Sequence, residues 1–233
     1  MTIAASGAAV ARGAPESVEQ NKAIGCRGTT AKSRAYYHEG MLRSLLLALL
    51  STAATSGAFA PRLPVAAAVT ARDTGGKSWT LLSPDAHQFD LLFFVATDCP
   101  ISNRYAPEIA RICADYRGRG VRCFLVYPET GLDSATVSSH TRDYGLSAAG
   151  PAIIDTGHVL VRAVGPRVTP EAALYSSAGR VYRGRIDDLY VDAGRSRRQA
   201  TQHDLRLRIE AALAGRSIVA AETEAVGCFI ANP

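Results

Sequence analysis

Residues 91–100 read LLFFVATDCP, an apolar run that ends at a cysteine followed by a proline. A short apolar run closed by polar residues and proline is typical of a strand buried on both faces of a sheet. The next segment, residues 101–117, carries apolar side chains at helical spacing. These side chains are Ile101, Tyr105, Ile109, Ile112 and Tyr116. Cys99 is therefore predicted to stand where a buried strand passes into a helix.

Strand and helix patterns alternate along the rest of the chain. The predicted strands are 79–82, 91–96, 121–127, 152–154, 172–175 and 181–185, and the predicted helices are 101–117, 134–144 and 205–214. The last two strands flank a turn sequence, which indicates a hairpin. Thr201 and Asp204 have the spacing of a capping box before the last helix. This order predicts an α/β fold with a central mixed β-sheet and helices on both faces.

A leader precedes the folded part. Residues 41–60 read MLRSLLLALLSTAATSGAFA, which has the layout of a secretory signal peptide with cleavage after Ala60. Its apolar stretch is shorter than the ~20 residues that a membrane span needs. Residues 1–40 are rich in Ala and Gly and lack periodicity, so we expect a disordered or mis-assigned extension with translation starting at Met41. An uncleaved anchor is the alternative.

The remaining chain is predicted to hold one domain. Residues 61–72 are expected to be a linker, 73–215 the folded domain and 216–233 a C-terminal tail. The mature protein is expected to be exported, periplasmic or extracellular, and without a stable membrane span. An oxidising compartment lets disulfides form and persist. Four cysteines remain after cleavage, and three complete pairings are open. They are Cys99, Cys113, Cys123 and Cys228.

The charge of the chain gives no sign of a nucleic-acid partner. The formal net charge is +5, but six of the 26 basic and three of the 21 acidic residues precede residue 61. The domain thus keeps 20 basic and 18 acidic residues, a net charge of +2. No cluster of Lys and Arg is interleaved with aromatic residues, so a nucleic-acid-binding function is not expected.

The position of Cys99 favours a reactive thiol. A helix N-terminus offers unpaired N–H groups and the positive end of the helix dipole, and both favour a thiolate. The thiolate is the nucleophilic form of cysteine. The alternative is a buried structural cysteine, because free Cys is among the most buried residue types.

Two segments resemble a known family. Residues 93–107, FFVATDCPISNRYAP, resemble the active-site segment of periplasmic TlpA/ResA-type thiol-disulfide oxidoreductases, F-W-A-T-W-C-P-P-C-R-x-E-x-P. The matching positions are Phe94, Ala96, Thr97, Cys99, Pro100 and Pro107. Residues 168–181, VTPEAALYSSAGRV, resemble the V-P-T-x-x-x-I-D-x-x-G-x-I segment of the same family. The chain is also similar to the broader redoxin group shared with the alkyl hydroperoxide reductase / thiol-specific antioxidant superfamily.

The resemblance covers roughly residues 70–215 and implies a thioredoxin-like three-layer fold. It implies a catalytic Cys99 that acts by mixed-disulfide exchange with protein thiols or disulfides, or with a small thiol. No cofactor and no metal are implied. It also implies a cis peptide before Pro170, with Pro170 packed against the sulfur. Thr169 would then turn its main-chain groups toward an extended substrate.

The active-site segment departs from the family at two positions. Ser102 replaces the second cysteine and Asp98 replaces the tryptophan. Ser102 cannot resolve a mixed disulfide, and at best its hydroxyl donates a hydrogen bond to the Cys99 sulfur. Asp98 disfavours the thiolate unless its carboxylate points away. Together with Pro100, Thr169 and Pro170, these two residues are predicted to support the active site.

The second thiol must come from elsewhere. Cys228 follows Gly227 in the tail, where mobility would let it reach Cys99 and act as the resolving cysteine. A packed or unpaired terminal cysteine is the alternative, and a partner protein or a small thiol could replace it. Cys113 and Cys123 are interpreted as core residues, with a structural bridge between them as an open alternative.

Other functions remain open. A peroxiredoxin-like thiol peroxidase would carry P-x-x-x-T-x-x-C, but Leu92 and Ala96 stand at the two required positions. A copper carrier on the same fold would use a second cysteine where Asn103 stands, and His140 and His158 are lone histidines. A redox-inactive interaction module would also lack one active-site cysteine.

Overall fold

The structure is a computed structural model that describes residues 67–85, 88–216 and 221–231. The predicted signal peptide, the extension before it and residues 61–66 of the predicted linker lie outside the described residues. Across the described ranges, no helix is long and apolar enough to cross a membrane.

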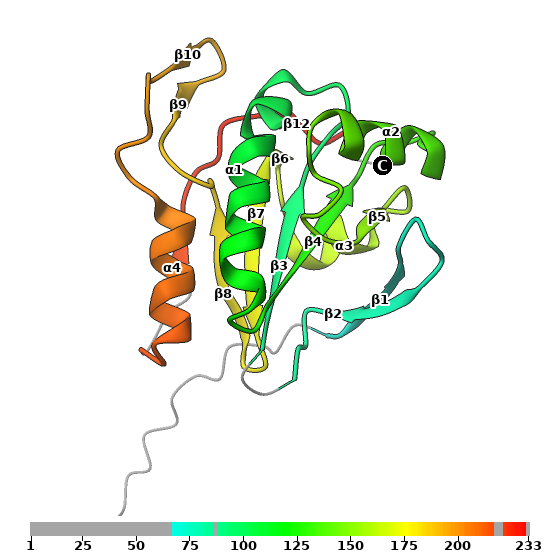
Figure 1. Cartoon of the computed structure of the whole chain (residues 1–233), viewed down its shortest axis with the longest axis horizontal. Coiled ribbons are helices and arrows are strands. Elements are labelled where there is room, and N and C mark those ends of the chain that lie inside the picture. Colours follow the sequence, from blue (N-terminus) through cyan, green and yellow to red (C-terminus); the bar gives the residue numbers. More distant parts are fainter. Residues whose placement is uncertain (1–66, 86–87, 217–220, 232–233) are drawn as a thin grey trace, which may run out of the picture. The chain divides into compact units, whose positions relative to one another are not determined.

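A mixed sheet forms the centre of the fold (Figure 1). Its strands are, in spatial order, β11 (Ala221–Glu222), β8 (Gly179–Gly184), β7 (Glu171–Ser176), β3 (Phe89–Phe94), β4 (Val121–Tyr127) and β5 (Ala152–Ile154). Strand β3 runs parallel to β4 and antiparallel to β7. The predicted hairpin is the antiparallel pair β7 and β8.

The other elements surround this sheet. The helices are α1 (Pro100–Arg117), α2 (Ser134–Asp143), α3 (Val159–Val164) and α4 (Asp204–Leu213). The short strands pair outside the central sheet, and they are β1 (Val69–Arg72) with β2 (Ser78–Leu81), β9 (Tyr190–Asp192) with β10 (Arg195–Ser196), and β6 (Val168–Thr169) with β12 (Cys228–Phe229).

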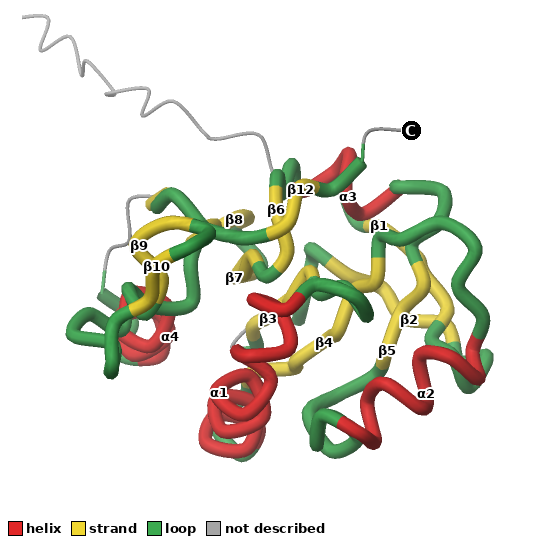
Figure 2. Tube along the Cα trace, turned by 90° about the horizontal axis from the view of Figure 1, so that it is seen from above, coloured by secondary structure: helices red, strands yellow, loops and turns green. Residues whose placement is uncertain are grey.

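The central strands of the sheet face two separate cores. Because side chains alternate along a strand, Leu91 and Phe93 of β3 pack in one core while Leu92 and Phe94 pack in the other. The first core takes in the apolar faces of α1 and α4, and the second takes in α3 and the β1–β2 hairpin. Figure 2 shows α1 and α3 on opposite sides of the sheet. The predicted three-layer thioredoxin-like α/β fold is therefore confirmed.

Two predicted irregular segments contain strands. Strand β1 occupies residues 69–72 at the end of the predicted linker, and β11 and β12 lie within the predicted tail. Strands of two to four residues are too short for a visible period-2 pattern, and the partners of β11 and β12 are distant in sequence. Local pattern therefore could not reveal them. Helix α3, with six residues, was missed for the same reason.

The predicted capping box at Thr201 is wrong. The N-cap of α4 is His203, which makes no side-chain capping hydrogen bond. The Thr201 hydroxyl instead donates to Asp188 Oδ2 at 2.6 Å, and its backbone N–H donates to Asp188 Oδ1 at 2.6 Å. Asp188 comes from the loop after β8, so a tertiary contact outcompetes the local cap.

Candidate functional site

Cys99 lies at the boundary between strand and helix that the sequence predicts. It is the N-cap residue of α1, with extended backbone angles, and Pro100 follows at the first helical position, where a missing N–H costs nothing. The backbone N–H of Ser102 donates to Cys99 Sγ at 3.4 Å. The Cys99 side chain is 1% exposed. The first turn of α1 carries no acidic residue, so helix-end N–H groups and the dipole act on the sulfur unopposed from within the helix.

The peptide bond between Thr169 and Pro170 is cis, as predicted. The carbonyl oxygen of Thr169 lies 3.1 Å from Cys99 Sγ, although the two residues are 70 positions apart in sequence. Both Thr169 and Pro170 are buried. The two segments that carry the family resemblance therefore meet at the sulfur.

The third segment of the site is the C-terminal strand β12. It pairs antiparallel with β6, with Cys228 opposite Thr169 and Phe229 opposite Val168, and the two strands lie side by side in both views (Figures 1 and 2). Cys228 is bonded to Cys99 in a disulfide that joins positions 129 residues apart, with 6.0 Å between their Cα atoms. Of the pairings left open by the sequence, the structure contains this one.

Gly227 lets β12 approach this closely. A Cβ built on Gly227 would overlap the carbonyl oxygen of Thr169 and stand 2.6 Å from its carbonyl carbon and 3.2 Å from Pro170 N. These neighbours are backbone atoms that cannot rotate away. A residue with a side chain at position 227 would therefore push Cys228 away from Cys99.

The other two cysteines are both free and buried. Cys113 of α1 and Cys123 of β4 lie in the first core, so the alternative of a bridge between them is wrong for this structure. A hydrogen bond with Cys123, together with burial, raises the pKa of the Cys113 thiol. The Cys113 thiol is therefore not prepared for nucleophilic chemistry.

The two substituted positions behave differently. The Ser102 side chain is 2% exposed, and its hydroxyl accepts a hydrogen bond from the Ala96 N–H at 3.2 Å. The Cys99 sulfur accepts a hydrogen bond from the Ser102 main-chain N–H. Asp98 and Pro100 are exposed at the rim of the site.

A half-buried carboxylate beside this segment was missed by sequence reasoning. Glu129 Oε1 accepts hydrogen bonds from the backbone N–H of Thr97 at 2.7 Å and from its hydroxyl at 2.6 Å. Burial raises the pKa of Glu129, and Oε2 is buried without a hydrogen-bond partner among the described residues. The available signal was its place just after β4, because ligands and functional groups gather at the carboxyl ends of parallel strands.

A hydrogen-bond chain fixes the loop before Cys99. Asn103 donates to the Thr97 carbonyl at 3.0 Å, and its Oδ1 is 2.8 Å from His140 Nε2. Since Oδ1 only accepts, Nε2 carries the proton and Nδ1 accepts from the Tyr127 hydroxyl at 2.9 Å. Burial lowers the pKa of His140 and so favours this neutral form. His140 is thus a positioning residue within the core.

A cavity of about 480 Å³ opens beside the disulfide. Its polar lining includes Thr97, Asp98, Glu129, His158, Thr169 and Cys228. His158 is 1% exposed, and its Nε2 donates to the Pro128 carbonyl at 2.7 Å while Nδ1 has no partner among the described residues. Within the part of the chain that the structure describes, no three His, Cys, Asp or Glu side chains are grouped as a metal site would require.

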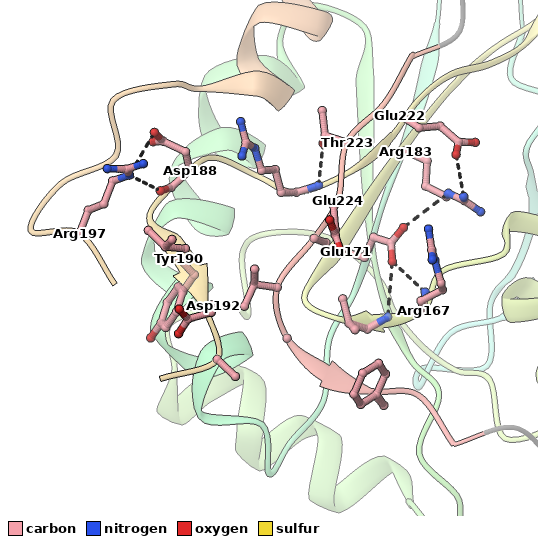
Figure 3. A pocket seen from close by; sticks show the side chains of 18 residues that line it. Arg167, Glu171, Arg183, Asp188, Tyr190, Asp192, Arg197, Glu222, Thr223 and Glu224 are labelled. Carbon is pink, nitrogen blue, oxygen red and sulfur yellow. Dashed lines mark hydrogen bonds and ion pairs between the residues drawn. The ribbon is translucent and has the colours of Figure 1, made fainter. Parts of the chain in front are cut away.

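A second cavity, of about 760 Å³, is lined by residues 222–227 of the C-terminal segment (Figure 3). Glu222 pairs with Arg183 at 2.9 Å, and the Thr223 hydroxyl accepts from the Arg185 N–H at 3.1 Å. Strand β11 pairs with β8 at the same place. These contacts tether the segment a few residues before the cysteine, independently of the disulfide bond.

We compared the chain with family models, curated proteins and solved structures, and only the solved structures gave matches. No family model matches the sequence, and no curated protein matches it. A hypothetical protein from Sinorhizobium meliloti is similar with 26% identity and a TM-score of 0.60, over 71% of this chain and 91% of that one. An uncharacterized conserved protein from Geobacillus kaustophilus is similar with 19% identity and a TM-score of 0.63, over 74% and 93%. A secreted disulfide oxidoreductase of Mycobacterium tuberculosis, described as homologous to E. coli DsbE, aligns with 16% identity and a TM-score of 0.42, over 63% and 95%.

Proposed function

We propose that this protein is an exported thiol-disulfide oxidoreductase in which Cys99 is the nucleophile and Cys228 the resolving cysteine. The observation that carries the proposal is the Cys99–Cys228 disulfide, which lies at the N-terminus of α1 and beside the cis Thr169–Pro170 peptide. Cys228 thus takes the part that Ser102 cannot play. The partners are protein thiols or disulfides, or a small thiol.

The proposed reaction has two exchange steps. The Cys99 thiolate attacks one sulfur of a substrate disulfide, forms a mixed disulfide, and releases the other substrate sulfur as a thiolate. The Cys228 thiolate then attacks Cys99 Sγ, closes the Cys99–Cys228 bond and releases the second substrate thiolate. The protein loses two electrons and the protons of its two thiols, and the substrate gains both. In reverse, the same steps oxidise a substrate dithiol.

The geometry supports these roles. The Ser102 N–H and the end of α1 stabilise negative charge on Cys99 Sγ during attack and release. The tether at Glu222 and Thr223 holds Cys228 within reach, which makes resolution an intramolecular step with a high effective concentration.

Export is part of the proposal and rests on the sequence of residues 41–60, which has the layout of a signal peptide. An oxidising compartment would let the Cys99–Cys228 disulfide persist between reaction cycles. N-terminal sequencing of the mature protein tests this point, and a mature sequence that begins before Met41 would contradict it.

Reduction of a disulfide substrate tests the activity. The reduced full chain should reduce insulin disulfides with dithiothreitol as the electron source, and Cys99→Ser should abolish the reaction. Cys228→Ser should instead accumulate a mixed disulfide at Cys99 when oxidised glutathione is added. If Cys228→Ser turns over as fast as the wild type, the resolving role is wrong. If the reduced protein consumes hydrogen peroxide but not disulfides, the thiol peroxidase alternative is correct.

A further inference from the structure

Few side chains of β12, the C-terminal strand that carries Cys228, contact the site. The strand comprises only Cys228 and Phe229, and the Phe229 side chain is 89% exposed. The contacts are mainly backbone contacts, because β12 pairs with β6 and the Ile230 N–H donates to the Arg167 carbonyl at 3.0 Å. Such pairing depends on an extended backbone and does not read the side chain at position 229.

Strand β6, which pairs with β12, also has contacts that do not involve β12. The Glu171 carboxylate accepts from the N–H groups of Arg167 at 2.8 Å and Val168 at 3.4 Å, and it forms an ion pair with Arg183 at 3.5 Å (Figure 3). The Glu171 side chain is 7% exposed. These contacts hold β6 extended from one side and leave the Thr169 and Arg167 carbonyls on the side that β12 pairs with.

The side chains that β12 and its neighbours turn inward follow a period of two. Val226 and Cys228 pack against the first core, and Ile230 packs against the second. Between them, Gly227 stands where a Cβ would collide with the Thr169 backbone. Residues 226–230 therefore follow the pattern apolar–Gly–Cys–any–apolar.

We propose that the edge of β6 is a binding site for extended cysteine-containing peptides that have glycine immediately before the cysteine, with β12 as its resident occupant. This inference rests on the proposed function and specifies its substrate class. Glycine is required because the Thr169 carbonyl is fixed beside Cys99, and any backbone that brings a cysteine to the same position meets the same carbonyl. Apolar residues two positions to either side would take the places of Val226 and Ile230.

The test uses the full chain with its own segment excluded from the site. In the Gly227→Ala/Cys228→Ser variant, the alanine prevents β12 from docking and the serine leaves Cys99 as the free thiol of the site. The probes are the peptides EAVGCFI, EAVACFI and EAVGCSI, each carrying thionitrobenzoate in a mixed disulfide. Cys99 attacks the peptide sulfur, and the coloured thiolate that leaves gives the rate.

We expect EAVGCFI to react about tenfold faster than EAVACFI, and EAVGCSI to match EAVGCFI. A ratio of about threefold or less between the glycine and alanine peptides would overturn the inference while leaving the Cys99–Cys228 couple intact. If no peptide reacts faster with Cys99 of the variant than with free cysteine in solution, the proposed function fails as well.

A second measurement does not depend on the double variant. Gly227→Ala in the otherwise unchanged chain should shift the Cys99–Cys228 equilibrium in a glutathione buffer about tenfold toward the thiols. Gly118→Ala is the matched control, because a Cβ there meets nothing within 4 Å and its φ is −72°. Equal shifts in the two variants would overturn the inference.

Discussion

Loss of the Cys99–Cys228 disulfide should lower the free energy of unfolding by up to about 5 kcal/mol. The bond closes a loop of 129 residues, and the chain-entropy relation for a loop of that length gives about 5 kcal/mol at 25 °C. The bond restricts the unfolded chain more than it strengthens the folded one. Measured values for disulfides reach from about 0 to 5 kcal/mol, so this figure is an upper bound.

The assay is urea unfolding of oxidised wild type and of Cys228→Ser. The variant should unfold at lower urea, and for a domain of this size its Tm should fall by roughly 10–20 °C if the full entropic effect is realised. Adding a reductant should lower the stability of the wild type and leave Cys228→Ser unchanged. If the stability of the wild type does not respond to reductant, the bond is absent in solution and the reasoning is refuted.

Three further predictions concern the thiols and the buried charges. In the reduced folded protein, iodoacetamide should modify Cys99 before Cys113, because a hydrogen bond with Cys123 and burial raise the pKa of the Cys113 thiol. The order of alkylation is followed by mass spectrometry, and equal labelling of the two cysteines would contradict the prediction. Burial raises the pKa of Glu129, so the protonated side chain stabilises the fold fully below about pH 4.5, and this stabilisation is lost as the pH rises through the folded-state pKa. Glu129→Gln should therefore become more stable than the wild type between about pH 5 and 8, as measured by urea unfolding. Arg122→Met should cost about 3 kcal/mol because it leaves the fully buried Asp90 without its ion-pair partner at 2.6 Å, and a loss below about 1 kcal/mol would contradict that role.

The central elements could be predicted because their signal is local. The apolar runs of β3 and β4 and the helical spacing of α1 are visible within single windows of sequence. Cys99 follows from them, since its place is set by the junction of β3 and α1. The cis Thr169–Pro170 peptide was predicted through the resemblance of its segment, because composition and periodicity carry no information on peptide isomers.

The rest of the site depends on contacts between distant segments. Strands β6 and β12 have two residues each and are joined across about 60 positions, so neither has a pattern of its own. Glu129 reaches Thr97 across 32 positions, and nothing around it in sequence marks it as a contact of that loop. The pairing of Cys99 with Cys228 was one of several alternatives, and the close approach at Gly227 explains how the structure realises it.

The most direct test of the account is the state of the four cysteines of the folded domain as a function of the glutathione redox ratio. The full chain is equilibrated over a series of ratios, quenched with acid, alkylated and mapped as peptides without reduction. The account predicts one two-electron transition in which Cys99 and Cys228 pass together from thiols to a single cross-linked peptide, while Cys113 and Cys123 stay thiols. A Cys99 that remains free at the most oxidising ratio, or that pairs with Cys113 or Cys123, would contradict it.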